Sequence, residues 1–129
     1  MANKRNTKLV LADLIAKKLD KENKRNKTEE YNIESLGGAV IIKVPEEGVL
    51  LKAIDMLKDE SITGVMEAYV YLIYNSIDLF QNTELHKEYE VQVPTDIVYK
   101  LLELSERLRL GNYIFEFSGA NNIEENVKN

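Results

Sequence analysis

The chain has no cysteine, no tryptophan and only one histidine among its 129 residues. Without cysteine, disulfide bonds, thiolate nucleophiles and cysteine-ligated zinc or iron–sulfur sites are excluded. The single histidine, His86, also excludes a metal site with several histidine ligands in one chain. The composition therefore rules out several kinds of metal and redox chemistry.

Long apolar runs are also absent, and none approaches the roughly 20 residues that a helix needs to span a bilayer. The apolar segment at residues 9–16 is interrupted by Asp13. Lys17 and Lys18 follow it, where a signal peptide would have a small-residue cleavage site. We therefore predict a protein of the cytoplasm.

The length and the apolar content predict one globular domain. A chain of 14.8 kDa falls within the common size of a single domain. Hydrophobic residues make up 44% and charged residues 30% of the chain. This is enough apolar content to close a core and too much for a disordered chain.

The net charge of −5 conceals an uneven distribution of charge along the chain. Residues 1–27, which we call the basic arm, contain nine lysines and arginines against three acidic residues, a net charge of +6. The remaining residues have a net charge of −11. A basic arm can bind nucleic acid or an anionic surface, or it can dock on the acidic body of its own or a neighbouring chain. Nucleic acid is the less favoured partner, because the arm has no aromatic residue and the acidic body repels phosphate.

The basic arm is predicted to contain an amphipathic helix over residues 7–19, with Thr7 as its N-cap. Residues 20–27 have no apolar side chain and are predicted to form a solvated linker or a frayed helix end. A short helix is marginal in isolation, so this one must pack on its own body, on another chain or on a partner. A membrane surface is disfavoured, because the apolar face has no aromatic anchor. The apolar residues that recur at helical spacing are Leu11, Leu14, Ile15 and Leu19.

Residues 28–119 are predicted to form an acidic globular domain, with a disordered tail at 120–129. Alternating apolar residues on both sides of Gly37 and Gly38 predict a β-hairpin over residues 30–44, in which the two glycines supply the positive φ of a tight turn. Two strands alone are marginal, so one face must lie against helices. The expected class is α+β, a mainly helical single domain with one β-hairpin.

The other segments of this domain are predicted to be mostly helical. A helix follows Pro45, and Ser61 caps a second one that is apolar on nearly all sides and therefore central. A short helix at 83–87 and a brief extended piece at 91–93 come next. Thr95 is predicted to cap a long helix that Gly111 ends, with a last helical turn at 113–118.

Candidate catalytic and metal-binding groups each have a simpler structural interpretation. His86 is the only group with an ordinary pKa near neutrality, but neighbouring charges indicate a surface histidine. Asp55 and Asp59 share a helix face, which is common at solvated helix ends. No serine lies in a nucleophile motif, and Gly37 with Gly38 lacks the residues of a phosphate loop. We therefore predict no catalytic residue, no metal ion and no cofactor.

Several collinear stretches of the chain form a family pattern. They are LVLADLIA at residues 9–16, IESLGG at 33–38, YLIY at 71–74 running on to Phe80, ELHK at 84–87 and PTDIV at 94–98. In this order and at this length, the chain resembles the XkdN-like tail assembly chaperones of contractile-tailed phages and prophages. The resemblance extends nearly to Gly119, and it depends on collinearity because no single stretch is a ligand or catalytic signature.

The resemblance implies a non-catalytic cytoplasmic protein made in the bacterial host during tail morphogenesis. Such chaperones bind the tape-measure protein, keep it soluble and help tail tube protein assemble around it. We expect the apolar face of the basic arm to contact the tape measure through Leu11, Leu14, Ile15 and Leu19. Tyr71 and Tyr74 are second candidates, because tyrosine suits both core margins and interfaces. The alternative is a phage regulatory protein that binds nucleic acid through the basic arm, and self-association as a homo-oligomer is left open.

Overall fold

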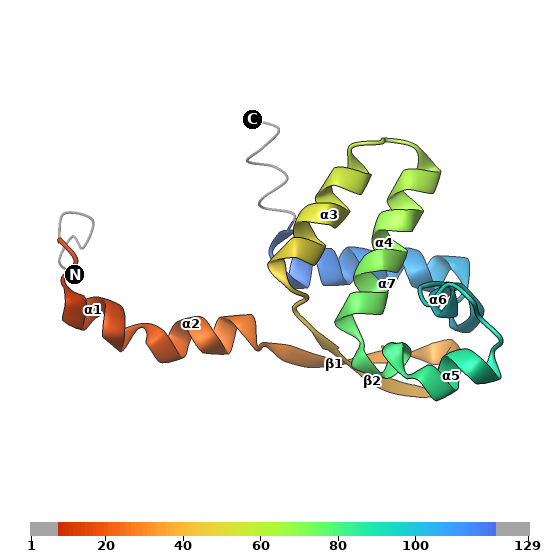
Figure 1. Cartoon of the computed structure of the whole chain (residues 1–129), viewed down its shortest axis with the longest axis horizontal. Helices are drawn as coiled ribbons and strands as arrows, with labels where there is room; N and C mark the ends of the chain where they lie inside the picture. Colours follow the sequence, from red (N-terminus) through yellow and green to blue (C-terminus); the bar gives the residue numbers. More distant parts are fainter. Residues whose placement is uncertain (1–7, 121–129) are drawn as a thin grey trace.

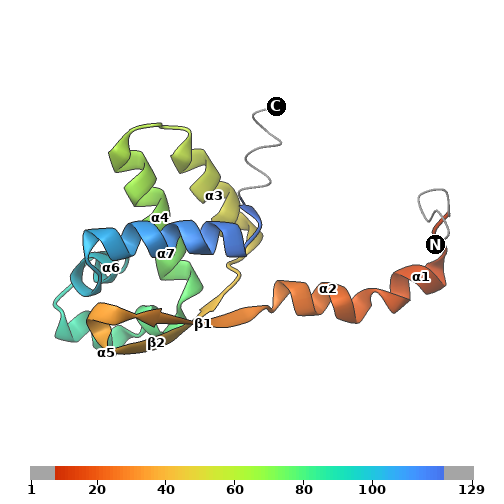
Figure 2. The same ribbon diagram turned by 180° about the vertical axis from the view of Figure 1, so that it is seen from behind.

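The computed structural model describes residues 8–120 of the chain. Helices and one antiparallel hairpin form a compact body, and the basic arm extends away from it (Figures 1 and 2). The predicted class, a mainly helical α+β domain with one β-hairpin, is confirmed. Within residues 8–120, no helix is long and apolar enough to cross a membrane.

The helical part of the basic arm starts later and continues further than predicted. Helix α1 (Leu11–Ala16) and helix α2 (Lys18–Arg25) are separated only at Lys17. The carboxylate of Asp13 accepts a hydrogen bond from the N–H of Val10 at 3.0 Å and begins the first helix. Thr7, the predicted N-cap, lies outside the described residues. The predicted linker is largely helical because its lysine, glutamate and arginine residues are good helix formers, although they cannot enter a core.

The hairpin consists of strands β1 (Thr28–Ile33) and β2 (Gly38–Lys43), which pair with Tyr31 opposite Val40. Ile33 on β1 and Ile42 on β2 are buried against the helices, whereas the alternate residues face solvent. The hairpin therefore has one covered face, as two isolated strands require.

The turn of the hairpin is longer than the predicted two-glycine turn. A short 3₁₀ helix, η2 (Glu34–Leu36), leads to Gly37. Gly37 has φ of 74°, a left-handed conformation that favours glycine. Gly38 is already part of β2 and does not have positive φ. The expectation that both glycines supply positive φ is wrong, because the extra turn of η2 already reverses the chain.

Helix α4 (Ile62–Ser76) lies at the centre of the body, between α3 (Glu47–Leu57) and α7 (Leu104–Phe117). Ser61 caps it as predicted, since its hydroxyl accepts a hydrogen bond from the N–H of Gly64 at 3.0 Å. The predicted central position is confirmed, but the first residue, Ile62, is 85% exposed. The fully buried residues of α4 are Ala68, Leu72, Ile73 and Ser76.

The predicted long C-terminal helix consists of two helices, α6 (Asp96–Leu101) and α7. Two side chains stabilise the break: the N–H of Glu103 donates to the carboxylate of Glu106 at 3.0 Å, and Arg107 donates to the carbonyl of Leu102 at 2.8 Å. Leu104, the first residue after the break, is 57% exposed. Gly111 does not end a helix but lies inside α7.

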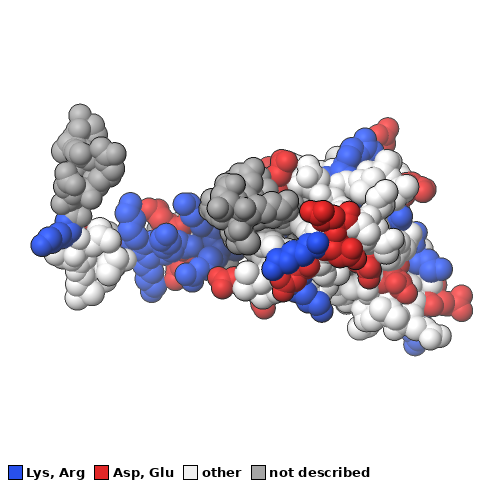
Figure 3. Space-filling model, turned by 90° about the horizontal axis from the view of Figure 1, so that it is seen from above, with Lys and Arg blue, Asp and Glu red and all other residues white. Residues whose placement is uncertain are grey.

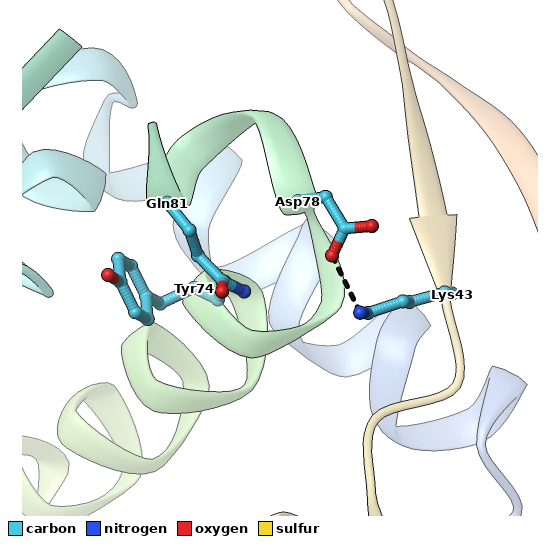
Figure 4. A network of polar contacts seen from close by, with 4 residues as sticks. All are labelled: Lys43, Tyr74, Asp78 and Gln81. Atoms are coloured by element: carbon cyan, nitrogen blue, oxygen red, sulfur yellow. Dashed lines mark hydrogen bonds and ion pairs between the residues drawn. The ribbon is translucent and has the colours of Figure 1, made fainter. Parts of the chain in front are cut away.

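The remaining elements close the edge of the body next to β2. The 3₁₀ helix η3 (Asp78–Gln81) is joined to β2 by an ion pair of 2.6 Å between Asp78 and Lys43 (Figure 4). Helix α5 (Thr83–Glu88) follows, capped by Asn82. Residues 91–93, predicted to be extended, form no strand. Ala120, expected in a disordered tail, is buried, and residues 121–129 lie outside the described residues.

Helices α4 and α7 lie close together at Gly111. A Cβ atom at this position would lie 2.4 Å from both Cβ and Cγ of Tyr69. Those atoms are next to the backbone of α4, so they cannot move away without shifting the helix. The absence of a side chain at Gly111 therefore sets the distance between the two helices.

The hairpin turn is attached to α7 through Glu106. Its carboxylate accepts hydrogen bonds from the hydroxyl of Ser35 at 2.7 Å and from the N–H of Ser35 at 3.2 Å. The N–H of Glu103 is the largest cause that lowers the pKa of Glu106, followed by the side chain of Ser35. The charged carboxylate thus both begins α7 and connects it to the turn.

Substitution of Gly111 by alanine tests the close approach of the two helices. We expect Gly111→Ala to lower the free energy of unfolding by about 2 kcal/mol, because overpacking outweighs the gain in helix propensity. Gly48→Ala in α3 is the matched control, since a Cβ atom there meets nothing within 4 Å. Urea unfolding measures both variants, and an equal or higher stability of Gly111→Ala would contradict the packing described.

The lowered pKa of Glu106 predicts a pH-dependent contribution to stability. A carboxylate whose pKa is lower in the folded state stabilises the fold above its ordinary pKa of about 4.3, and this contribution disappears as the pH falls through the lowered value. Glu106→Gln should therefore destabilise the protein at pH 7, and the difference from wild type should shrink at pH 3. Urea unfolding at both pH values measures this, with Glu67→Gln on α4 as the control. A difference that does not change with pH would show that the charge is not involved.

Candidate protein-interaction surface

The basic arm presents large apolar side chains to solvent. The exposed fraction is 74% for Leu11, 58% for Leu14, 63% for Ile15 and 66% for Leu19. Leu9 and Val10 before α1 are exposed to a similar degree. A monomeric protein rarely leaves so many large apolar side chains together in solvent, which makes this group a candidate interaction surface.

The two helices of the basic arm, α1 and α2, do not pack on the body. Every residue from 8 to 30 is exposed, and neither α1 nor α2 has a buried residue. Figures 1 and 2 show the two helices running outward from the start of β1, away from the helices of the body. Of the predicted alternatives, packing on the chain's own body is therefore not what the structure shows.

The cations of α1 and α2 are not paired with carboxylates within residues 8–120. Among the described residues, no lysine or arginine of α1 and α2 lies within ion-pair distance of a carboxylate. Figure 3 shows the blue side chains gathered along the arm, while red side chains are more frequent on the body. The arm therefore combines exposed apolar residues with unpaired positive charge.

A groove follows one side of the arm across the separation at Lys17. Its volume is about 720 Å³. Leu9 and Leu14 line one end, and the cations of α2 line the other. The residues that line the groove are Leu9, Asp13, Leu14, Lys17, Asp20, Lys21, Asn23 and Lys24.

The arm joins the body through a cluster of side chains that the sequence does not indicate. The Nζ atom of Lys27 lies 4.3 Å from the centre of the Phe117 ring, and it donates to the carbonyl of Phe117 at 3.5 Å. The hydroxyl of Tyr113 donates to the carboxylate of Glu29. The rings of Tyr31 and Tyr113 lie 5.2 Å apart. These contacts fix the point at which the arm leaves the body.

The two tyrosines predicted as second contacts lie on α4, in the body and away from the arm. Tyr71 is half-buried, and the Nζ atom of Lys52 lies 4.9 Å from its ring centre. Tyr74 is also half-buried, burial raises the pKa of its hydroxyl, and its carbonyl accepts a hydrogen bond from Gln81 at 3.0 Å (Figure 4). The structure does not bring these two tyrosines together with the apolar residues of the arm.

His86, Asp55 and Asp59, which were considered for chemistry, each contact a neighbouring group of the body. His86 is half-buried rather than on the surface, and its Nε2–H donates to the carbonyl of Phe80 at 2.6 Å. Asp55 pairs with Lys58 at 3.2 Å, and Asp59 accepts from the N–H of Ser61 at 3.4 Å. In the described part of the chain, no group of three or more histidine or acidic residues is placed to hold a metal ion.

The exposure of the arm predicts that its apolar residues do not stabilise the body. We expect the double variant Leu14→Asp with Ile15→Asp to unfold within about 0.5 kcal/mol of wild type, as substitutions on an exposed surface usually do. The matched control is Leu72→Asp with Ile73→Asp, the same residue pair fully buried in α4, which should prevent folding. Thermal unfolding followed by circular dichroism distinguishes the two, and a large loss of stability in the first variant would place the arm in the core.

Comparison of the chain with models of known protein families, with curated proteins and with solved structures finds no match. The assignment of a function therefore depends on the sequence resemblance and on the geometry of the basic arm.

Proposed function

We propose that this protein is a phage tail assembly chaperone that binds the tape-measure protein and keeps it soluble during tail morphogenesis. It acts in the cytoplasm of the bacterial host, has no catalytic role and needs no cofactor. Two facts support the proposal: the collinear resemblance to XkdN-like chaperones and the exposed apolar residues of the basic arm.

The observation on which the proposal rests is that the arm's apolar residues are not covered by its own body. Leu11, Leu14 and Ile15 are each more than half exposed. A helix of this length is marginal in water when it contacts nothing, so covering it with a partner stabilises both the helix and the complex. A protein whose task is to cover another protein's apolar surface needs such an uncovered face.

The mechanism follows from the geometry of the arm. A tape-measure protein is long and helical with exposed apolar stripes, and a helix of the arm covers one stripe by helix-in-groove or coiled packing. Leu11, Leu14, Ile15 and Leu19 make the contacts. Tyr71 and Tyr74 contribute only where the partner also reaches α4, and tail tube protein is a second candidate partner.

Co-expression with the tape-measure protein of the same phage or prophage tests the proposal. Wild-type protein should raise the soluble fraction of the tape measure severalfold and co-elute with it at moderate salt. Leu14→Asp with Ile15→Asp should reduce the soluble fraction to the level without chaperone, because the aspartates would be desolvated against an apolar stripe. The matched control is Leu51→Asp with Ile62→Asp, a pair exposed on the body, which should retain the activity.

Two results would contradict this function. One is a folded wild-type protein that neither solubilises nor binds the tape measure. The other is full activity of the Leu14→Asp, Ile15→Asp variant.

The competing proposal, a nucleic-acid-binding regulator, is favoured by the unpaired cations of α2. Its signature is affinity for duplex DNA that falls steeply with salt and disappears when residues 1–27 are removed.

A further inference from the structure

We infer that the segment that binds the basic arm is an acidic amphipathic helix, with apolar residues opposite α1 and carboxylates opposite α2. The inference rests on the proposed function and specifies the chemistry of the partner. It follows from the order in which apolar and basic residues occur along one face of the arm.

The first step is that this face continues through the separation at Lys17. The N–H of Lys17 donates to the carbonyl of Asp13 at 3.2 Å, and the N–H of Lys21 donates to the carbonyl of Lys17 at 3.0 Å. Helical hydrogen bonding with a spacing of four residues is therefore kept on both sides of Lys17. Residues spaced alternately by three and four stay close to one side of the arm, as in a coiled-coil seam.

The second step is the change in chemistry along this seam. Its members are Leu11, Leu14, Lys18, Lys21 and Arg25. The first two are apolar and belong to α1, and the last three are basic and belong to α2. The other two exposed apolar residues, Ile15 in α1 and Leu19 in α2, flank this seam on one side. The groove on the arm shares Leu14 and Lys21 with this seam, and its lining beside them contains both cations and the carboxylates of Asp13 and Asp20.

The third step is the cost of covering unpaired charge. Lys18, Lys21 and Arg25 form no ion pair among the described residues. A partner that covers the apolar half of the seam also takes water away from these cations, and this is unfavourable unless carboxylates replace the water. The best partner segment is thus about 20 residues long, with leucine-type residues facing α1 and glutamates or aspartates facing α2.

Other occupants use only part of this surface. Nucleic acid would satisfy the cations of α2, but it would leave Leu11 and Leu14 exposed, and residues 8–27 include no aromatic side chain for stacking on bases. The arm of a second copy would place like charges against one another in α2. The acidic body of a second copy has the right charge and is therefore one outcome that the experiment must distinguish.

Two synthetic helical peptides test the inference with the full-length protein. Both have about 21 residues and the same leucine stripe; one has glutamates opposite α2, and the other has lysines at the same positions. Fluorescence anisotropy at 50 and 300 mM NaCl measures binding. We expect the glutamate peptide to bind about tenfold more tightly at low salt, as three exposed charge pairs predict, and this advantage to shrink at high salt.

Charge reversal in the arm supplies the matched control. Lys18→Glu with Lys21→Glu should reverse the preference between the two peptides, because the apolar half of the seam is unchanged. Leu14→Asp with Ile15→Asp should abolish binding of both peptides. Neither double variant should change thermal unfolding of the body, so loss of binding cannot be attributed to loss of the fold.

The inference is overturned by equal binding of the two peptides, by preference for the lysine peptide or by no binding of either. It is also overturned when sedimentation shows that two copies associate in a salt-dependent way and that the glutamate peptide does not dissociate them. Tighter binding of duplex DNA than of the glutamate peptide to the arm would overturn it as well. Rescue of the tape measure without preference for the glutamate peptide would refute the inference alone and leave the proposed function in place.

Discussion

The contact between Gly111 and Tyr69 determines the arrangement of the rest of the structure. It sets how close α7 lies to α4, and α7 in turn provides the surface to which the hairpin is attached. Glu106 near the start of α7 binds the hairpin turn through Ser35. Near the end of α7, Tyr113 contacts Tyr31 of β1, and Phe117 contacts Lys27 just before β1. A shift of α7 would therefore move both ends of the hairpin and, with them, the root of the basic arm.

The body and the arm differ in how their apolar and charged side chains are placed. Its core is an ordinary apolar core around α4, and the groups considered for chemistry are occupied in caps, ion pairs and hydrogen bonds. The arm has the opposite properties, with exposed apolar residues and unpaired charge. Because only two residues lie between the end of α2 and the start of β1, the body holds the arm at a defined place without covering its apolar residues.

Local patterns were sufficient for much of the fold, and contacts between distant residues account for the rest. The alternation around Val40, the cap at Ser61 and the spacing of Leu11, Leu14 and Ile15 are local signals, and the hairpin, α4 and the first helix of the arm follow from them. Gly111 looks like a helix stop in the sequence, and only the position of Tyr69 shows why it lies inside a helix. The contact of Lys27 with Phe117 joins residues 90 positions apart and leaves no local signal.

The separation of charge between arm and body makes the molecule an electric dipole along its longest axis, with the positive end at the arm (Figure 3). In the field of a negatively charged partner, such a molecule turns so that the arm arrives first. The same charge distribution makes the negatively charged bodies of two copies repel each other. The exposed charged residues of the arm therefore affect how fast such a partner is encountered, and not only how tightly it is bound.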